Sequence, residues 1–337
     1  MTKQQHTGHL SRRTLTTGLA AVALGMGVPR LSSSASRPAA GVLRTPDARF
    51  RDLPGYDFKP HYRDVVDPRF GKLRMHYVDE GSRRAPVILL LHGQGSWAYL
   101  YRRMIPVLAG AGYRVIAPDY IGFGRSDKLL RPEDYGFQNH IDWLTAFLGA
   151  MEFTDVTAFM FDWGGYFGLP IAAEHPEFFS RIVLSNTLLP KGMSQGRDWF
   201  IKWREKQLAL PRFPQGEMVN DGVVHKLSPE LITAYDAPYP DETYKAGPRR
   251  FPMILPILDD DPASIANAAA WDKLATWQKP VLTLFSAKGA GMRPEPLQAH
   301  LPGARGQPHA LIDEAGFYIV EDQPLILAQH VIDFAKA

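Results

Sequence analysis

The chain has 337 residues, of which 45% are hydrophobic and 22% charged, so it can bury a large core and is not intrinsically disordered. Its formal charge of +3 arises at the N-terminus, because the first 35 residues hold four basic side chains and no acidic one. The remainder has 34 basic and 35 acidic residues, so charge gives no reason to expect nucleic acid or a membrane surface as a partner. The absence of cysteine excludes disulfides, a thiolate nucleophile and cysteine-bound metal.

Residues 1–35 have the pattern of an export signal. Arg12 and Arg13 precede an apolar run from Leu19 to Val28, and small residues follow at positions 33–35. This pattern resembles a twin-arginine signal and predicts an exported protein, periplasmic or extracellular. An accidental arginine pair in a short amphipathic segment is the alternative. No later stretch reaches the roughly 18 apolar residues that a membrane span needs.

Beyond about residue 70, short apolar runs alternate with longer segments of helical spacing. The expected strands are 86–91, 113–117, 156–161, 181–184, 280–285 and 309–312. The expected helices are 97–108, 138–151, 165–175, 294–300 and 324–337. This alternation predicts an α/β fold with a mostly parallel sheet flanked by helices. The preceding segment 38–69 is rich in Pro, Arg and Asp and is expected to be an extended lead-in.

The alternation stops between Pro190 and about Pro262, where aromatic residues, Pro and Gly occur without a strand-like run. An insertion between parallel strands lies at their carboxyl edge, where such folds bind ligands. We expect a helical cap over the pocket, inserted after the sixth strand. The predicted organisation is a signal segment at 1–35, a core at 36–189, a cap at 190–262 and a second core part at 263–337.

The strongest local signal is Asp162, which follows an expected strand, opens an expected helix and precedes Trp163, Gly164 and Gly165. A sharp strand-to-helix turn lifts one side chain above the sheet edge, and small residues after it leave room for the backbone. A carboxylate in this position can act as a nucleophile that displaces a leaving group from an sp³ carbon. The alternative is an Asp that only caps the helix.

A second motif, residues 92–96, ends the first strongly apolar strand and begins with His92 and Gly93. In folds with such a nucleophile turn, the residue after His-Gly and the residue after the nucleophile donate backbone N–H groups to a developing anion. These residues are Gln94 and Trp163. The side-chain amide of Gln94 could add a donor, and His92 is expected to hold the loop.

These motifs resemble, in the same order, those of the haloalkane dehalogenases, a family with the α/β-hydrolase fold. The resemblance runs from about Arg44 to the C-terminus and rests on four segments: 92–102, 118–128, 162–165 and 234–247. It implies that Asp162 attacks the halogen-bearing carbon of a small apolar substrate and that the Trp163 indole holds the halide. It also implies a second indole from the cap, which Trp203 or Trp199 could supply.

Two positions depart from this family. Its catalytic His directly follows an Ala-Gly pair near the C-terminus, where this chain has Phe317, and Gly289 stands where its acid is expected. Asn186 occupies the acid position of other branches. The bulky pair Met160 and Phe161 predicts that burial raises the pKa of Asp162. Four further histidines are expected to be surface or packing residues: His140, His175, His300 and His309.

Displacement by Asp162 needs no base, whereas hydrolysis of the resulting ester does. The sequence therefore predicts a haloalkane dehalogenase-like hydrolase whose turnover is very slow or absent. Two alternatives stay open: a non-hydrolytic lyase, isomerase or cyclase, and a protein that binds ligands or is alkylated once. No cofactor or metal is expected, because the chain has no phosphate loop, dinucleotide fingerprint or metal-ligand cluster. Nothing in the sequence indicates the oligomeric state.

Overall fold

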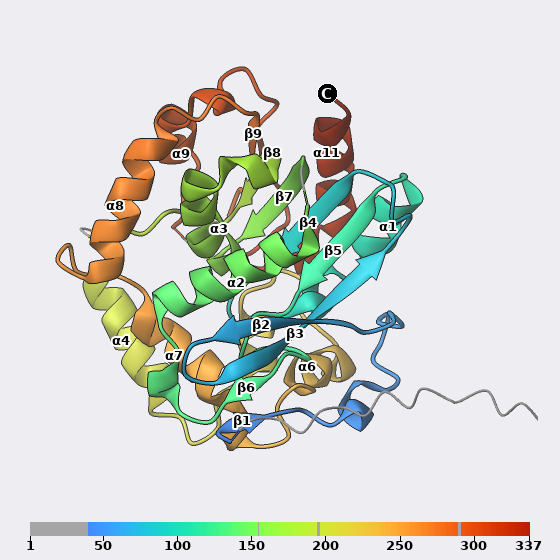
Figure 1. Ribbon diagram of the computed structural model, residues 1–337, viewed down its shortest axis with the longest axis vertical. Coiled ribbons are helices and arrows are strands. Elements are labelled where there is room, and N and C mark those ends of the chain that lie inside the picture. The colour runs from blue at the N-terminus through green and yellow to red at the C-terminus, as the bar shows by residue number, and fades with distance from the viewer. Residues whose placement is uncertain (1–39, 154, 194–195, 289–290) are drawn as a thin grey trace, which may run out of the picture. The chain divides into compact units, whose positions relative to one another are not determined.

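The computed structural model describes residues 40–153, 155–193, 196–288 and 291–337, so the expected signal segment 1–35 and Gly289 lie outside the described residues. Its centre is an eight-stranded sheet with the order β10-β9-β8-β7-β4-β5-β3-β2 (Figure 1). The six strands from β10 to β5 are parallel, and β3 and β2 add an antiparallel edge. The strands are β2 (His61–Asp67), β3 (Gly71–Glu80), β4 (Val87–Leu91), β5 (Arg114–Pro118), β7 (Val156–Phe161), β8 (Phe179–Ser185), β9 (Val281–Ser286) and β10 (Ala310–Ile312).

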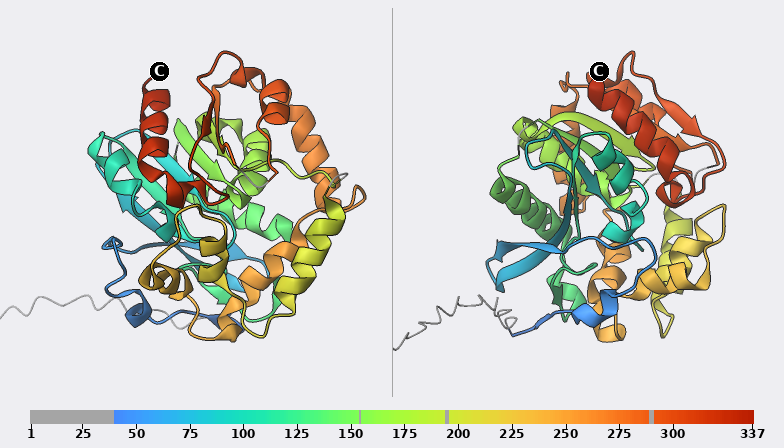
Figure 2. Two further views of the ribbon diagram at one scale, coloured as in Figure 1. Left: turned by 180° about the vertical axis from the view of Figure 1, so that it is seen from behind. Right: turned by 90° about the vertical axis from the view of Figure 1, so that its right-hand side faces the viewer.

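The central strands are apolar along their length because helices cover both faces of the sheet (Figures 1 and 2). In β4, Leu89 and Leu91 belong to one apolar cluster, whereas Ile88 and Leu90 belong to the other. Two-sided burial of this kind is typical of parallel sheets, and the predicted α/β class is confirmed. The covering helices are α2 (Phe137–Met151), α3 (Trp163–Glu174) and α8 (Pro262–Leu274) over the first cluster, and α1 (Ile105–Gly110) and α11 (Pro324–Lys336) over the second.

The expectation of an extended lead-in over 38–69 is wrong in part. The short strand β1 (Val42–Leu43) pairs with β6 (Lys128–Leu129), and β2 forms a hairpin with β3. Strand β2 lies at the sheet edge and buries only Val65 and Asp67, so its sequence lacks a clear apolar alternation. The six strands that were expected from the sequence all have counterparts in the sheet.

The helix expected over 97–108 is also wrong, because the structure divides it into a 3₁₀ turn, η2 (Ala98–Tyr101), and helix α1. Pro106 occupies the second position of α1. A proline inside one continuous helix would lack an N–H donor and clash with the preceding turn, so the helix begins anew before it.

The segment between β8 and β9 contains helices and no strand within 190–193 and 196–280. Figure 1 shows three of its helices, α4, α6 and α7, below β7 and β8. Helix α8, the last of the segment, packs on α3, and Lys273 pairs with Glu174 there at 2.6 Å. The elements before α8 are α4 (Arg197–Leu208), α5 (Gln215–Asp221), α6 (Pro229–Asp236), η5 (Glu242–Lys245) and α7 (Ala246–Ile254). Among the described helices, none is long and apolar enough to cross a membrane.

Asp119, directly after β5, organises the loops at the carboxyl edge of the sheet. Its buried carboxylate accepts hydrogen bonds from the backbone N–H groups of Ala98 at 2.7 Å and Arg125 at 2.8 Å. It also pairs with Nδ1 of buried His76 at 2.7 Å. A side chain at Gly124 would overlap this carboxylate, so the turn at 122–125 closes around it. Charge-assisted bonds of this kind are stronger than neutral ones, and the loops after β4 and β5 are fixed together.

A buried ion pair joins η2 to the short helix α10 (Ile319–Asp322). Arg102 donates two hydrogen bonds to Glu321, at 2.7 and 3.0 Å, and both side chains are at most 5% exposed. Removing one partner leaves an uncompensated buried charge.

We therefore expect Glu321→Ala to lower the free energy of unfolding by about 3–5 kcal/mol, measured by urea denaturation at pH 7. Glu314→Ala is the matched control, because Glu314 pairs with Lys288 on the surface, where about 0–1 kcal/mol is typical. If the two substitutions lowered the free energy of unfolding equally, the stabilising role of the buried Arg102–Glu321 pair would be contradicted.

Candidate active site

Asp162 lies between β7 and α3 in a backbone conformation that side chains rarely adopt, with φ 49° and ψ −115°. Such strain costs of order 1–3 kcal/mol and occurs where the surrounding structure enforces it. Here the Asp162 carbonyl accepts hydrogen bonds from the Thr187 hydroxyl at 2.7 Å and the Gly165 N–H at 2.9 Å. A side chain at Gly164 would overlap the Leu91 carbonyl. The glycine that was read from the sequence as making room is therefore required by packing.

The two predicted backbone donors meet at the Asp162 carboxylate. The Gln94 N–H donates to Oδ2 at 2.9 Å, and the backbone N–H of Trp163 also favours the charged carboxylate and lowers the pKa of Asp162 against the effect of burial. Gly93 allows this approach, because a side chain there would collide with Asp162 and Phe161. The side-chain Nε2 of Gln94 is buried and has no hydrogen-bond partner among the described residues. Gln94 thus has a backbone donor that binds Asp162 and a buried side-chain donor without a partner in the described chain.

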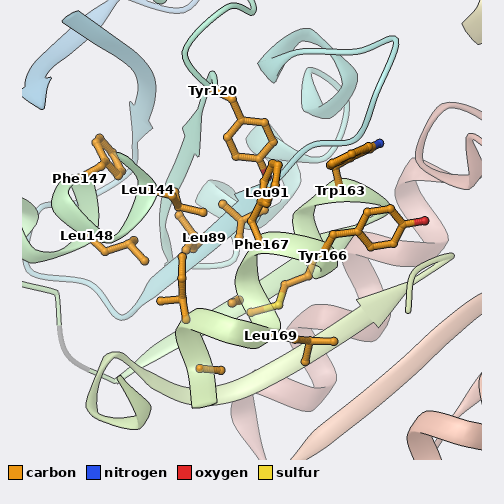
Figure 3. Packing of buried hydrophobic residues seen from close by; sticks show 14 of the residues in the cluster. Leu89, Leu91, Tyr120, Leu144, Phe147, Leu148, Trp163, Tyr166, Phe167 and Leu169 are labelled. Atoms are coloured by element: carbon orange, nitrogen blue, oxygen red, sulfur yellow. The ribbon is translucent and has the colours of Figure 1, made fainter. Parts of the chain in front are cut away.

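The Trp163 ring forms part of an aromatic wall next to Asp162. It is 3% exposed and its centroid lies 4.3 Å from that of Phe251 on α7 and 5.3 Å from that of Phe167. Figure 3 shows Trp163 at the edge of the cluster, with its indole nitrogen pointing away from Leu144 and Leu148. The nitrogen is therefore directed outward from the apolar core.

The structure does not bring the cap tryptophans to this wall. Trp199 is 68% exposed, and the ring contacts of Trp203 are with Phe200 at 5.7 Å and Trp199 at 6.4 Å, all on α4. In the described chain α4 buries no side chain completely. The role of Trp203 as the second halide-holding indole stays a prediction.

Tyr166 is a site residue that the sequence analysis missed. It is 4% exposed, and the interaction of its hydroxyl with the Asp162 carboxylate favours the charged form and so opposes the rise in the pKa of Asp162. The sequence signal for it is the spacing of four residues from Asp162, which places both groups on one side of the first turn of α3.

The pKa of Asp162 is raised from 3.8 to about 7 by burial, in the direction predicted from its bulky neighbours. The hydrogen bonds from Gln94, Trp163 and Tyr166 stabilise the charged form and oppose this effect. No basic side chain compensates the burial among these contacts. The carboxylate is therefore poorly solvated and readily protonated near neutral pH.

Phe317 stands at the position where the sequence resemblance predicts a catalytic His, and its ring lies 5.6 Å from the Phe161 ring and 5.1 Å from the Tyr318 ring. Asn186 joins this loop to the sheet, because its Nδ2 donates to the Phe317 carbonyl at 2.8 Å and its Oδ1 accepts from the Ser286 N–H at 3.0 Å. Asn186 thus has a structural role that uses both ends of its amide.

None of the histidines considered from the sequence contacts Asp162 through a described hydrogen bond. His92 Nδ1 donates to the Gly93 carbonyl and Nε2 accepts from the Tyr120 N–H, so both nitrogens are occupied. This agrees with the loop-holding role expected for it. His140 packs on Phe167 with centroids 5.1 Å apart, and burial lowers its pKa to about 3. The others pair elsewhere: His175 with Glu177, His300 with Trp271, and His309 with Thr283 and Ala304. The described residues also contain no cluster of acidic or histidine side chains able to hold a metal ion.

Comparisons with known proteins define the class of this chain. A family model described as alpha/beta hydrolase fold matches residues 86–220. The tetrameric haloalkane dehalogenase DpaA from Paraglaciecola agarilytica NO2 superposes with a TM-score of 0.78 at 31% identity, covering 86% of this chain and 96% of that one. The chain thus has the α/β-hydrolase fold.

The family follows from curated relatives. The haloalkane dehalogenase of Psychrobacter cryohalolentis is 46% identical over 297 residues, which cover 87% of this chain and 97% of that protein. Haloalkane dehalogenase 1 of Mycobacterium tuberculosis is 48% identical over 298 residues, covering 88% and 99%. The chain belongs to the haloalkane dehalogenase family of hydrolases, as its motifs predicted.

The raised pKa of Asp162 predicts a pH-dependent stability. A carboxyl group whose pKa is higher in the folded than in the unfolded state carries no penalty below the unfolded value, near 4; its destabilisation of the fold grows between pH 4 and about 7 and is complete above that. We expect Asp162→Asn, which removes the charge and keeps the shape, to be more stable than the parent at pH 8 by on the order of 2–4 kcal/mol. At pH 4 the variant and the parent should have similar free energies of unfolding.

Urea unfolding at both pH values measures this difference. Asp313→Asn is the control, because Asp313 is exposed and its substitution should produce no such pH-dependent gap. A variant no more stable than the parent at pH 8 would show that Asp162 ionises without penalty.

Proposed function

We propose that this enzyme cleaves a carbon–halogen bond in a small apolar substrate through nucleophilic attack by Asp162. The observation that carries the proposal is the buried Asp162 carboxylate, held at a strained turn by the Gln94 N–H at 2.9 Å. A desolvated carboxylate with a fixed donor on one oxygen can present the other oxygen to an electrophilic carbon. The aromatic rings of Trp163, Phe251 and Phe161 favour an apolar substrate over a polar one.

In this reaction an Asp162 oxygen forms a bond to carbon, the carbon–halogen bond breaks, and its electron pair leaves with the halide. The indole N–H of Trp163 and the unpaired amide of Gln94 are suited to hold that anion. Trp203 remains the residue that family resemblance suggests for a second indole.

Hydrolysis of the resulting ester is proposed to be slow. It needs a base to activate water, and Phe317 occupies the position where the sequence resemblance implies a His. Loss of a general base typically lowers a rate on the order of 10² to 10⁴-fold. The enzyme would then accumulate the alkyl ester after the first displacement.

Incubation with 1-bromobutane at pH 8 tests this proposal. We expect rapid release of one equivalent of bromide, a mass increase of one butyl group on the intact protein, and then a slow phase of continued release. Asp162→Asn should show neither the burst nor the adduct. Fast release over many turnovers would overturn the slow hydrolysis step. Absence of both bromide and adduct would overturn the nucleophilic role and favour a non-hydrolytic reaction.

The same assay applied to Phe317→His should separate the two steps. A His at this position supplies a base, so the slow phase should accelerate by at least about tenfold, while the burst rate stays unchanged because displacement needs no base. Phe317→Tyr is the control of similar size without an imidazole. A slow phase unchanged by His would show that the missing base does not limit release.

We also propose that residues 1–35 direct export by the twin-arginine pathway. Relatives that match over 97–99% of their own length cover only 87–88% of this chain, which leaves room for an additional segment. A reporter fused after residue 40 should leave the cytoplasm of a bacterium with this pathway. When Arg12 and Arg13 are both replaced by Lys, the fusion should stay in the cytoplasm. Export of the doubly substituted fusion would contradict the proposal.

A further inference from the structure

We propose that the Tyr166 hydroxyl is a further catalytic group, which holds the Asp162 carboxylate in the resting site and transfers its hydrogen bond to the departing halide. The proposal relies on the proposed displacement for its chemistry and on the contacts of Tyr166 for its geometry. Tyr166 lies three residues after Trp163 and four after Asp162 on α3. Residues at these spacings share one side of a helix.

The Tyr166 side chain places a second donor beside that of Trp163. The two ring centroids are 5.1 Å apart, and both residues are buried. In Figure 3 the hydroxyl oxygen of Tyr166 and the indole nitrogen of Trp163 both lie on the side of the cluster opposite Leu144 and Phe147. Two donors on adjacent rings can therefore approach one anion next to Asp162.

The hydrogen bond of Tyr166 differs from those of the other tyrosines near Asp162. Tyr101 donates to the Leu91 carbonyl at 2.7 Å and Tyr318 donates to the Gln94 carbonyl at 3.1 Å. The charge on these two carbonyl acceptors does not change during the reaction. Tyr166 instead interacts with the Asp162 carboxylate, the one group that loses its charge when the ester forms, and this interaction lowers the pKa of Asp162 against the effect of burial.

During displacement the negative charge moves from the Asp162 oxygen to the halide, and no proton is transferred. Hydrogen bonds to an ion are roughly twice as strong as those to a neutral group. The Tyr166 hydroxyl therefore makes a stronger hydrogen bond when it turns from the neutral ester to the halide. Burial raises the pKa of Tyr166 well above its usual value, so the phenol keeps its proton throughout.

This assignment makes Tyr166 a further halide donor beside the Trp163 indole and the Gln94 amide. The sequence resemblance suggests Trp203 as a second indole donor, but the described ring contacts of Trp203 are with residues of its own helix. Substitution of each residue separately distinguishes the two donors.

The first test measures iodide binding to the free enzyme at pH 6 through the change in tryptophan fluorescence. Trp163→Phe serves as the blank. We expect Tyr166→Phe to weaken binding by about tenfold or more, as for loss of a hydrogen bond to an ion. Trp203→Phe should have little effect. Tyr239→Phe is the matched control, because it removes a buried hydroxyl that has no partner among the described residues. In the parent enzyme, affinity should fall as the pH rises through 7, since ionised Asp162 repels iodide and competes for the hydroxyl.

The second test is the pH dependence of the bromide burst from 1-bromobutane. Loss of the Tyr166 hydrogen bond removes a stabiliser of the carboxylate, so the burst midpoint of Tyr166→Phe should move to higher pH by about one unit. A merely structural role of the ring would leave this midpoint unchanged, because Phe retains the ring.

Iodide affinity decides the inference independently of turnover. Unchanged iodide affinity in Tyr166→Phe, no iodide binding by the parent, or loss of affinity only in Trp203→Phe would each overturn it. If the parent binds iodide through Tyr166 but releases no bromide from 1-bromobutane, the donor assignment stands and the proposed displacement fails.

Discussion

The active-site edge of this enzyme depends on one buried carboxylate that takes no part in the chemistry. Asp119 joins the loop after β5 to the N–H of Ala98 and to His76 in the antiparallel hairpin. The residue after it, Tyr120, donates its backbone N–H to Nε2 of His92, which fixes the loop that carries Gln94. The donor position at Asp162 is thus set by a chain of contacts that begins two loops away. A carboxylate can do this because it accepts several hydrogen bonds at once.

The surroundings of Asp162, the proposed nucleophile, are of the opposite kind. Asp119 is paired with His76, whereas the groups that stabilise the Asp162 carboxylate in the described chain are N–H and hydroxyl groups without a full positive charge. Burial without a cation leaves Asp162 easily protonated and, when ionised, weakly solvated and reactive. The same functional group is thus a structural anchor at Asp119 and the proposed nucleophile at Asp162, according to its partners.

The sequence predicted the parts of the site that are encoded locally. The turn at Asp162 and the donors Gln94 and Trp163 lie in short motifs, whose geometry follows from a strand that ends in a sharp turn. Tyr166 was not recognised, because a tyrosine on an apolar helix is usually a packing residue and only the structure shows its hydroxyl partner. The edge strand β2 was missed because one-sided burial leaves a weak pattern. The position of Trp203 depends on how the cap packs, which the sequence of α4 does not encode.

The backbone at Asp162 also restricts how this site can change over evolutionary time. At φ 49° and ψ −115°, glycine is accommodated most easily, asparagine and aspartate tolerate positive φ better than most residues, and β-branched side chains are excluded. Drift away from carboxylate chemistry would therefore pass first through Asn or Gly. Because Gly93, Gly164 and the Thr187 hydrogen bond hold the turn independently of the carboxyl group, its shape would outlast the activity. A turn of this shape in a related chain is consequently evidence of ancestry before it is evidence of catalysis.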